Sequence, residues 1–251
     1  IDKLNGDDFS HIQGDFHIEN VSAAFEICRE IGMPSADLKK FLSRLSAPKG
    51  RFEAINVGQP FKVIIDFAHT PDALEVMLKN SHKLRASNEG NCIVVFGCGG
   101  DRDRTKREIM GSISDKLSDS IILTSDNSRS ENAMSIISDI EKGISNKKYE
   151  IIEDRQEAIK FAISFANKGD VIVIAGKGHE SNQYECGYFF SYSDHDVVFF
   201  ELIEKISKWS KKWAIDSLDT GSEIIFVSKN FPTNKINLIH NQQRKIGRAH
   251  V

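Results

Sequence analysis

The chain has 251 residues, of which 40% are hydrophobic and 27% are charged. That apolar fraction supports a sizeable core, and a formal net charge of −3 disfavours a protein built to neutralise nucleic-acid phosphates. No run of roughly 18 apolar residues occurs, which excludes a membrane-spanning helix. The four cysteines lie far apart without C-x-x-C or zinc spacing, so we expect buried thiols in a reducing cytoplasm.

Both ends of the sequence suggest a gene fragment. The chain begins at Ile1 rather than at Met, and residues 246–251 read like a translated sequencing adapter, so we exclude them from fold prediction. Residues 206–251 lose the regular pattern of the rest, and we expect the truncated start of a following unit, without an assigned function.

Residues 16–50 show a helical pattern in two stretches. In the first, small and apolar residues recur at helical spacing before Gly32, which predicts that the helix ends there. A second helix is predicted from Ser35, with three apolar residues on one face: Leu38, Phe41 and Leu42. Because Pro48 and Gly50 break this pattern, we place a domain boundary after residue 50.

From Arg51 onward, short apolar runs alternate with amphipathic stretches. The runs are rich in Val and Ile, as expected for strands buried on both faces, and cover residues 61–67, 92–96, 120–124, 149–152 and 171–175. Between them, Thr70 with Pro71 predicts one helix start, and Asp154 with Glu157 predicts another. This alternation predicts an α/β fold with a Rossmann-like, doubly wound, mostly parallel sheet.

Ligands of open α/β sheets bind beyond the carboxyl ends of the strands. Polar segments follow several predicted strands, at residues 66–72, 97–107, 125–131 and 176–180. The glycines of 97–107 lack the G-x-G-x-x-G spacing of a dinucleotide site. They are followed by basic side chains that could bind a carboxylate or phosphate, or form a solvated turn: Arg102, Arg104, Lys106 and Arg107.

Asp126, Asn127 and Arg129 combine a carboxylate, an amide and a guanidinium within a few residues. Together these groups suit the ammonium and carboxylate of an amino acid. An equally open alternative is that Asn127 or Ser128 merely caps the next helix. Residues 176–180 resemble the end of a phosphate loop without the G-x-x-x-x-G-K-[ST] spacing.

In this order the segments resemble the motifs of the Mur ligases, over residues 12–203. The matching motifs are Gly50-Arg51-Phe52-Glu53, residues 66–72, residues 96–103, Asp126-Asn127-Ser128-Arg129 and Gly176-Lys177-Gly178-His179-Glu180. The similarity is greatest to the branch that adds the third residue of the peptidoglycan stem peptide.

The resemblance implies an ATP-dependent ligase that adds meso-diaminopimelate to UDP-N-acetylmuramoyl-L-alanyl-D-glutamate through an acyl phosphate. It implies that residues 51–205 form the C-terminal, amino-acid-binding domain, and residues 1–50 the last helices of the central ATPase domain. ATP and Mg²⁺ would be the cofactors, with the metal held mainly by the missing part of the central domain. We expect a cytoplasmic monomer without a nucleic-acid partner or membrane insertion, and we expect the fragment alone to be inactive.

The same resemblance assigns residues to two sides of the site. Asn20, Arg51, Asp66 and His69 would lie on the nucleotide side, and Asp66 and His69 are the catalytic candidates. The predicted amino-acid pocket contains Arg102, Asp126, Asn127, Ser128, Arg129, Gly176 and Glu180. In it, the two arginines would hold carboxylates, and Asp126 and Glu180 would hold ammonium groups.

The family's Asp-Asn-Pro-Arg motif marks the enzymes that take diaminopimelate. Ser128 stands at the proline position and frees φ there, whereas Arg129 is retained, which favours diaminopimelate over lysine. Two alternatives remain open: a related ligase that adds L-lysine or glutamate, and a non-catalytic amino-acid-binding module. An oxidoreductase, suggested by the fold alone, is disfavoured by the missing dinucleotide motif.

Overall fold

The computed structural model describes residues 14–42, 44–85, 90–146 and 148–220. The chain divides into two units, residues 1–207 and 208–251, and the described part of the second is the helical stretch that ends at Thr220. The predictions for residues 1–13 and 246–251 lie outside the described residues. Within the described part, no helix combines the length and the apolar character needed to cross a membrane.

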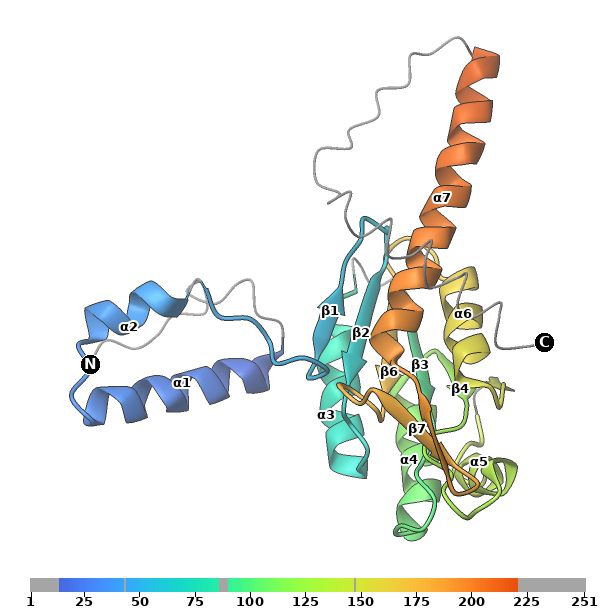
Figure 1. Cartoon of the computed structure of the whole chain (residues 1–251), viewed down its shortest axis with the longest axis horizontal. Coiled ribbons are helices and arrows are strands. Elements are labelled where there is room, and N and C mark those ends of the chain that lie inside the picture. Colours follow the sequence, from blue (N-terminus) through green and yellow to red (C-terminus); the bar gives the residue numbers. More distant parts are fainter. Residues whose placement is uncertain (1–13, 43, 86–89, 147, 221–251) are drawn as a thin grey trace. The chain divides into compact units, whose positions relative to one another are not determined.

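The central element is a six-stranded sheet with the order β1-β2-β6-β3-β4-β5 (Figure 1). Its strands are β1 (Glu53–Ile55), β2 (Lys62–Asp66), β3 (Cys92–Phe96), β4 (Ser120–Leu123), β5 (Tyr149–Ile151) and β6 (Val171–Ala175). All neighbours pair in parallel except β1, which is antiparallel to β2. The predicted mostly parallel sheet is confirmed. The pattern missed β1, because Glu53, Ala54 and Ile55 include only one large apolar side chain and form no apolar run.

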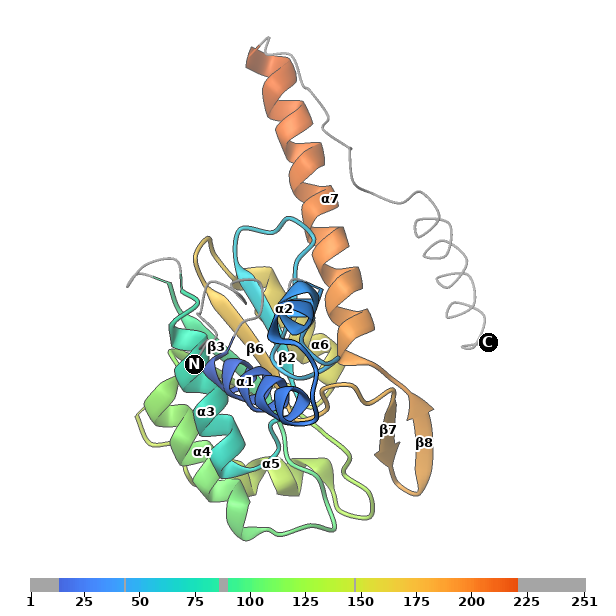
Figure 2. The same ribbon diagram turned by 90° about the vertical axis from the view of Figure 1, so that its left-hand side faces the viewer.

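Helices cover both faces of the sheet (Figures 1 and 2). On one face, α3 (Pro71–His82), α4 (Thr105–Leu117) and α5 (Ala133–Glu141) share a core with Ile64, Val94 and Val173. On the other, α6 (Arg155–Phe165) and the start of α7 (Asp194–Thr220) pack on the alternate strand residues, such as Ile65 and Val95. Successive strand side chains point to opposite faces, so a continuous apolar run serves both cores.

The predicted helix starts are confirmed by their caps. Thr70 accepts a hydrogen bond from the Ala73 N–H at 3.3 Å, and Pro71 occupies the first helical position of α3. Asp154 Oδ1 accepts from the Glu157 N–H at 3.0 Å at the start of α6. Helix α7 continues to Thr220, beyond residue 205 where we expected the regular pattern to end.

Two helices precede the sheet, α1 (Asp15–Glu30) and α2 (Ser35–Leu42), close to their predicted positions. Leu38 and Leu42 are buried with Phe25 in a small cluster between them. Phe41 is 52% exposed, and it lines an apolar hollow beside α1 together with Leu38 and Leu42, as expected for residues on one face. Residues three and four positions apart lie on the same face of a helix, so the three side chains fall within about 100° of one another.

A hairpin that the pattern did not predict follows the sheet, formed by β7 (Asn182–Glu185) and β8 (Tyr188–Ser191). Figure 2 shows it projecting from the body of the domain. Its two turn residues, Cys186 and Gly187, both have a positive φ, as in the tight turns that suit hairpins. Every residue of β8 is exposed, which explains why no amphipathic alternation marks this strand.

Candidate functional site

The polar segments meet at the point of the sheet where the connections that follow neighbouring strands lead to opposite faces. The connections after β3 and β4 lead to helices on one face, whereas the connection after the adjacent β6 leads to α7 on the other. A hollow of about 540 Å³ lies at this crevice, where ligands bind in open α/β sheets. Its lining residues are Asn127, Arg129, His179, Glu180, Ser181, Asn182, Tyr184 and Phe189.

The hairpin forms one wall of this hollow because it is hydrogen-bonded to the loop after β4. The Arg129 N–H donates to the Tyr184 carbonyl at 3.1 Å, and the Cys186 N–H donates to the Arg129 carbonyl at 2.9 Å. Arg129 adopts a positive φ of 53° to make both contacts. The rings of Tyr184 and Phe189 stack with centroids 4.4 Å apart and give the wall an apolar surface.

Asn127 is the hub of the polar floor. Its Oδ1 accepts from Lys177 Nζ at 2.9 Å and from the Tyr184 N–H at 2.8 Å, and its Nδ2 donates to Glu180 Oε2 at 2.9 Å. The alternative that Asn127 or Ser128 caps the next helix is wrong. Helix α5 is capped by Asn132, whose Oδ1 accepts from the Ser135 N–H.

Two side chains in the hollow keep unused polar groups. Among the described residues, no hydrogen bond reaches Glu180 Oε1. Arg129 donates through Nη1 to the Gly100 and Asn127 carbonyls, at 2.7 and 3.3 Å, while its Nε and Nη2 have no partner in the described part of the chain. The two residues, which both line the hollow, thus keep one acceptor and a pair of donors that complement an ammonium and a carboxylate.

Beneath the floor lie Asp126 and Lys177, both buried. Gly176 has a φ of 115°, and a Cβ there would lie 2.6 Å from Asp126 Oδ2, so only glycine leaves room for this carboxylate. Burial lowers the pKa of Lys177, and the carboxylates of Asp126 and Glu180 oppose that effect. We assigned no role to Lys177 from the sequence. The signal that could have revealed it is a lysine between two glycines at a strand end.

The basic segment after β3 is mostly engaged with the protein itself. Arg107 is 1% exposed and donates to Glu131 at 2.9 Å and to Asp139 at 3.0 Å, so its predicted ligand-binding role is wrong. Its acidic partners are distant in sequence, and no local pattern could show them. Lys106 donates to the His69 carbonyl at 2.7 Å. Arg102 is exposed and does not line the hollow, and its role as a carboxylate ligand stays a prediction.

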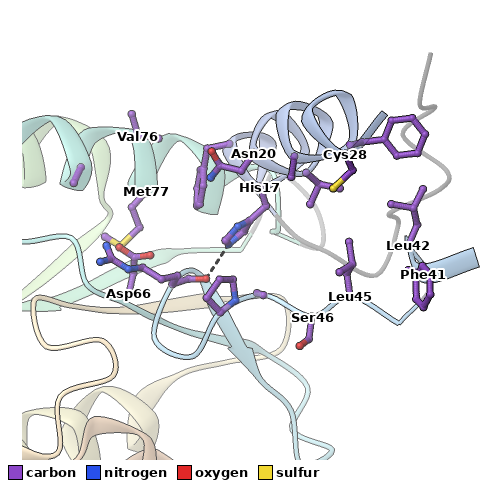
Figure 3. A pocket seen from close by; sticks show the side chains of 18 of the residues that line it. His17, Asn20, Cys28, Phe41, Leu42, Leu45, Ser46, Asp66, Val76 and Met77 are labelled. Atoms are coloured by element: carbon purple, nitrogen blue, oxygen red, sulfur yellow. Dashed lines mark hydrogen bonds between the residues drawn. The ribbon is translucent and has the colours of Figure 1, made fainter. Parts of the chain in front are cut away.

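A second, mainly apolar hollow of about 860 Å³ lies between α1, α2 and α3 (Figure 3). Among the residues predicted on the nucleotide side, Asn20, Arg51 and Asp66 line it, whereas His69 does not. His17 Nε2 lies 2.9 Å from the carbonyl oxygen of Arg51, and Figure 3 draws this contact.

Asp66 has a clear local function in the structure. Its two carboxylate oxygens accept from the backbone N–H groups of Phe52, at 2.6 Å, and Ala68, at 2.7 Å. Burial raises the pKa of Asp66, and these two hydrogen bonds act in the opposite direction. The carboxyl group thereby fixes the segment after the domain boundary to the end of β2.

Phe67 connects the two hollows at the edge of the sheet. The Arg51 guanidinium lies over its ring at 4.6 Å, and the His69 and His179 rings lie 4.6 and 5.4 Å away. Gly50 packs directly on the loop after β6, since a Cβ there would lie 2.1 Å from the His179 backbone nitrogen. The boundary segment and the loop that carries Glu180 are therefore in backbone contact.

Residues 50–178 match the family described as "Mur ligase, glutamate ligase domain". The chain is 47% identical over 203 residues to the UDP-N-acetylmuramoyl-L-alanyl-D-glutamate–2,6-diaminopimelate ligase of Halalkalibacterium halodurans. That alignment covers 81% of this chain and 40% of the relative. The ligase of the same name from Fusobacterium nucleatum is 42% identical over 193 residues, which cover 76% of this chain and 39% of the relative.

A solved structure of a UDP-N-acetylmuramoyl-L-alanyl-D-glutamate–2,6-diaminopimelate ligase superposes with a TM-score of 0.61 and 38% identity. The superposition covers 77% of this chain and 39% of that structure. A UDP-N-acetylmuramate–alanine ligase from Thermotoga maritima, at 16% identity and a TM-score of 0.51, shares the fold. The chain thus spans about two fifths of the length of the relatives that it matches.

Proposed function

The chain belongs to the Mur ligase family, and we propose that it supplies the amino-acid-binding domain of an ATP-dependent ligase. The proposed reaction joins meso-diaminopimelate to UDP-N-acetylmuramoyl-L-alanyl-D-glutamate in peptidoglycan synthesis, as the names of the relatives suggest. In this proposal residues 51–205 bind the incoming amino acid, and residues 1–50 are the last helices of the central ATPase domain.

The observation that carries the proposal is the pair of unused groups in the hollow after β4 and β6. Arg129 presents Nε and Nη2 for a carboxylate, and Glu180 presents Oε1 for an ammonium. Diaminopimelate has a carboxylate and an ammonium at each end, whereas lysine lacks the distal carboxylate. A guanidinium without a carboxylate partner is costly to desolvate, so Arg129 favours the ligand with the extra carboxylate.

The domain's task in the reaction is to hold the amine beside the activated carboxyl group and to keep water away. When bound, ATP supplies the activation of that carboxyl as an acyl phosphate. The large, mainly apolar hollow beside α1 could hold the base and ribose of a nucleotide, and Asn20 and Arg51, which line it, would supply polar contacts.

The described residues offer no matching site for Mg²⁺, and the sequence offers no phosphate loop for ATP. No group of three or more His, Cys, Asp or Glu side chains that could hold a metal ion occurs among the described residues. The sequence also lacks a G-x-x-x-x-G-K-[ST] loop. We therefore assign the metal and the phosphates to the portion of the relatives that this chain does not span.

Calorimetric titration of the 251-residue chain with meso-diaminopimelate and with L-lysine tests the proposal. We expect the wild type to prefer diaminopimelate, and Arg129→Ala to lose at least tenfold of that preference, about 1.4 kcal/mol. Arg44→Ala, which removes an exposed arginine from the turn after α2, is the matched control and should change nothing.

The other outcomes separate the alternatives. Tighter binding of L-lysine by the wild type would indicate the related lysine-adding ligase. An unchanged preference for diaminopimelate in Arg129→Ala would contradict the role given to this side chain. Binding of diaminopimelate without ligation by a protein extended to the length of the relatives would favour the non-catalytic module.

A further inference from the structure

Lys177 is a fully buried ammonium that lies below the amino-acid hollow without lining it. Its Nζ donates to Asn127 Oδ1 at 2.9 Å and to the Asn182 carbonyl at 3.1 Å. The same atom lies 3.8 Å from Asp126 Oδ1 and 3.6 Å from Glu180 Oε2. A buried charge is tolerated only with such partners, and here every one of them belongs to the loops that form the site.

We propose that Lys177 is a positioning residue of the amino-acid pocket, which sets the orientation of Asn127 and, through it, of Glu180. This inference rests on the proposed function. Lys177 does not contact the ligand, because none of its side chain is exposed to the hollow.

Lys177 helps to fix the orientation of the Asn127 amide. Its oxygen receives two donors, Lys177 Nζ and the Tyr184 N–H, so its NH₂ group faces the opposite way. There it donates to Glu180 Oε2 at 2.9 Å. With Oε2 held from below by Asn127 and Lys177, Oε1 is the oxygen left to face the hollow.

Lys177 also balances the negative charge of the two carboxylates in the floor of the hollow. Asp126 and Glu180 bring two carboxylates to 3.8 and 3.6 Å from one ammonium. Without Lys177 the two carboxylates would repel each other across the buried floor, and Glu180 would turn toward solvent. The ring of Tyr192, with its centroid 5.6 Å from Nζ, closes the lysine's site from the far side.

The test is a set of double-mutant cycles on the 251-residue chain, titrated with meso-diaminopimelate. Lys177→Met keeps the length of the side chain and removes its charge, and Lys168→Met, at an exposed turn, is the matched control. We expect Lys177→Met to bind at least tenfold more weakly and Lys168→Met to bind like the wild type.

The cycles separate positioning from a merely structural role. In the Glu180→Gln background, Lys177→Met should weaken binding by less than about twofold, because both changes disable the same contact. In the Arg129→Ala background, the loss from Lys177→Met should stay near tenfold. Unchanged affinity in a folded Lys177→Met chain, or equal losses in all backgrounds, would overturn the proposal.

Two further measurements test the proposal if Lys177→Met does not fold or if the wild type binds no amino acid. If Lys177→Met does not fold, the wild-type Lys177 ammonium resonance is followed by ¹H–¹⁵N NMR, and it must shift when diaminopimelate is added. If the wild type binds no amino acid, the proposed function fails. The positioning role is then judged by hydrogen exchange of the Tyr184 amide, which should accelerate at least tenfold in Lys177→Met, and an unchanged rate rejects it.

Discussion

Arg155 connects the two strand ends on which the amino-acid hollow is built, and its removal is the most informative stability test. Its side chain is fully buried and binds Asp194 at the start of α7 through two hydrogen bonds of 2.8 Å. Nη2 also donates to the Ala175 carbonyl at 2.9 Å, and Nη1 donates to the Ser125 carbonyl at 3.4 Å. These carbonyls directly precede Gly176 and Asp126 in the chain.

The expected cost of Arg155→Met follows from the partner left behind. Burial alone would lower the pKa of Arg155, but Asp194 outweighs it and raises that pKa, so the guanidinium is charged at neutral pH. Removing one member of a buried pair costs about 3–5 kcal/mol, because the other charge stays buried without a partner. Removing both charges in Arg155→Met/Asp194→Leu should cost less than the single change, since no ion then remains unpaired.

Urea unfolding at pH 7 measures both variants against the wild type, with Arg44→Met as an exposed control. A loss below about 1 kcal/mol for Arg155→Met would refute the reasoning, since that is the range of a surface pair. A double variant as unstable as the single variant would also refute it. In that case the carbonyl contacts, and not the charge pair, would account for the stability.

Three shorter predictions test other features. Gly50→Ala should lower the free energy of unfolding by about 2–4 kcal/mol, because φ is 67° and the loop packed on Gly50 leaves no room for a Cβ. Gly58 also has a positive φ but open space around it, so Gly58→Ala should cost only about 1 kcal/mol. The hydrogen bond from its buried partner Arg107 lowers the pKa of Glu131, so the stability that this group adds at neutral pH is lost as the pH falls below the ordinary value of 4.5. In Glu131→Gln the midpoint of urea unfolding should therefore depend less on pH over that range. An unchanged pH dependence would contradict this linkage. Burial raises the thiol pKa of Cys92 and Cys98 to about 12, so a disulfide reagent at pH 8 should modify them only after unfolding, and fast reaction of either in the native chain would show that the core opens there.

The sheet was predictable because its strands are buried on both faces. Runs such as 92–96 and 171–175 are apolar at every position, and cap residues such as Thr70 mark the helix between two of them. Elements without such a signal were missed. Strand β1 has one large apolar residue, Ile55, and β8 is exposed throughout, so neither shows the pattern of a buried strand.

The site was predictable as a set of strand ends but not as a set of contacts. The sequence indicated that the loops carrying Asp126 and Glu180 follow buried strands, and parallel topology then brings them to one edge. It could not show that Arg107 forms ion pairs with acidic residues that are distant in sequence, or that Lys177 is buried beneath the amino-acid hollow. Those facts depend on side-chain packing between segments that are distant in sequence.

The most direct test of the central claim is a structure of the 251-residue chain with meso-diaminopimelate. The account predicts the ligand in the hollow after β4 and β6, with one carboxylate on the free donors of Arg129 and one ammonium on Glu180 Oε1. Diaminopimelate bound in the hollow beside α3, or bound after β6 without contact to either side chain, would contradict it.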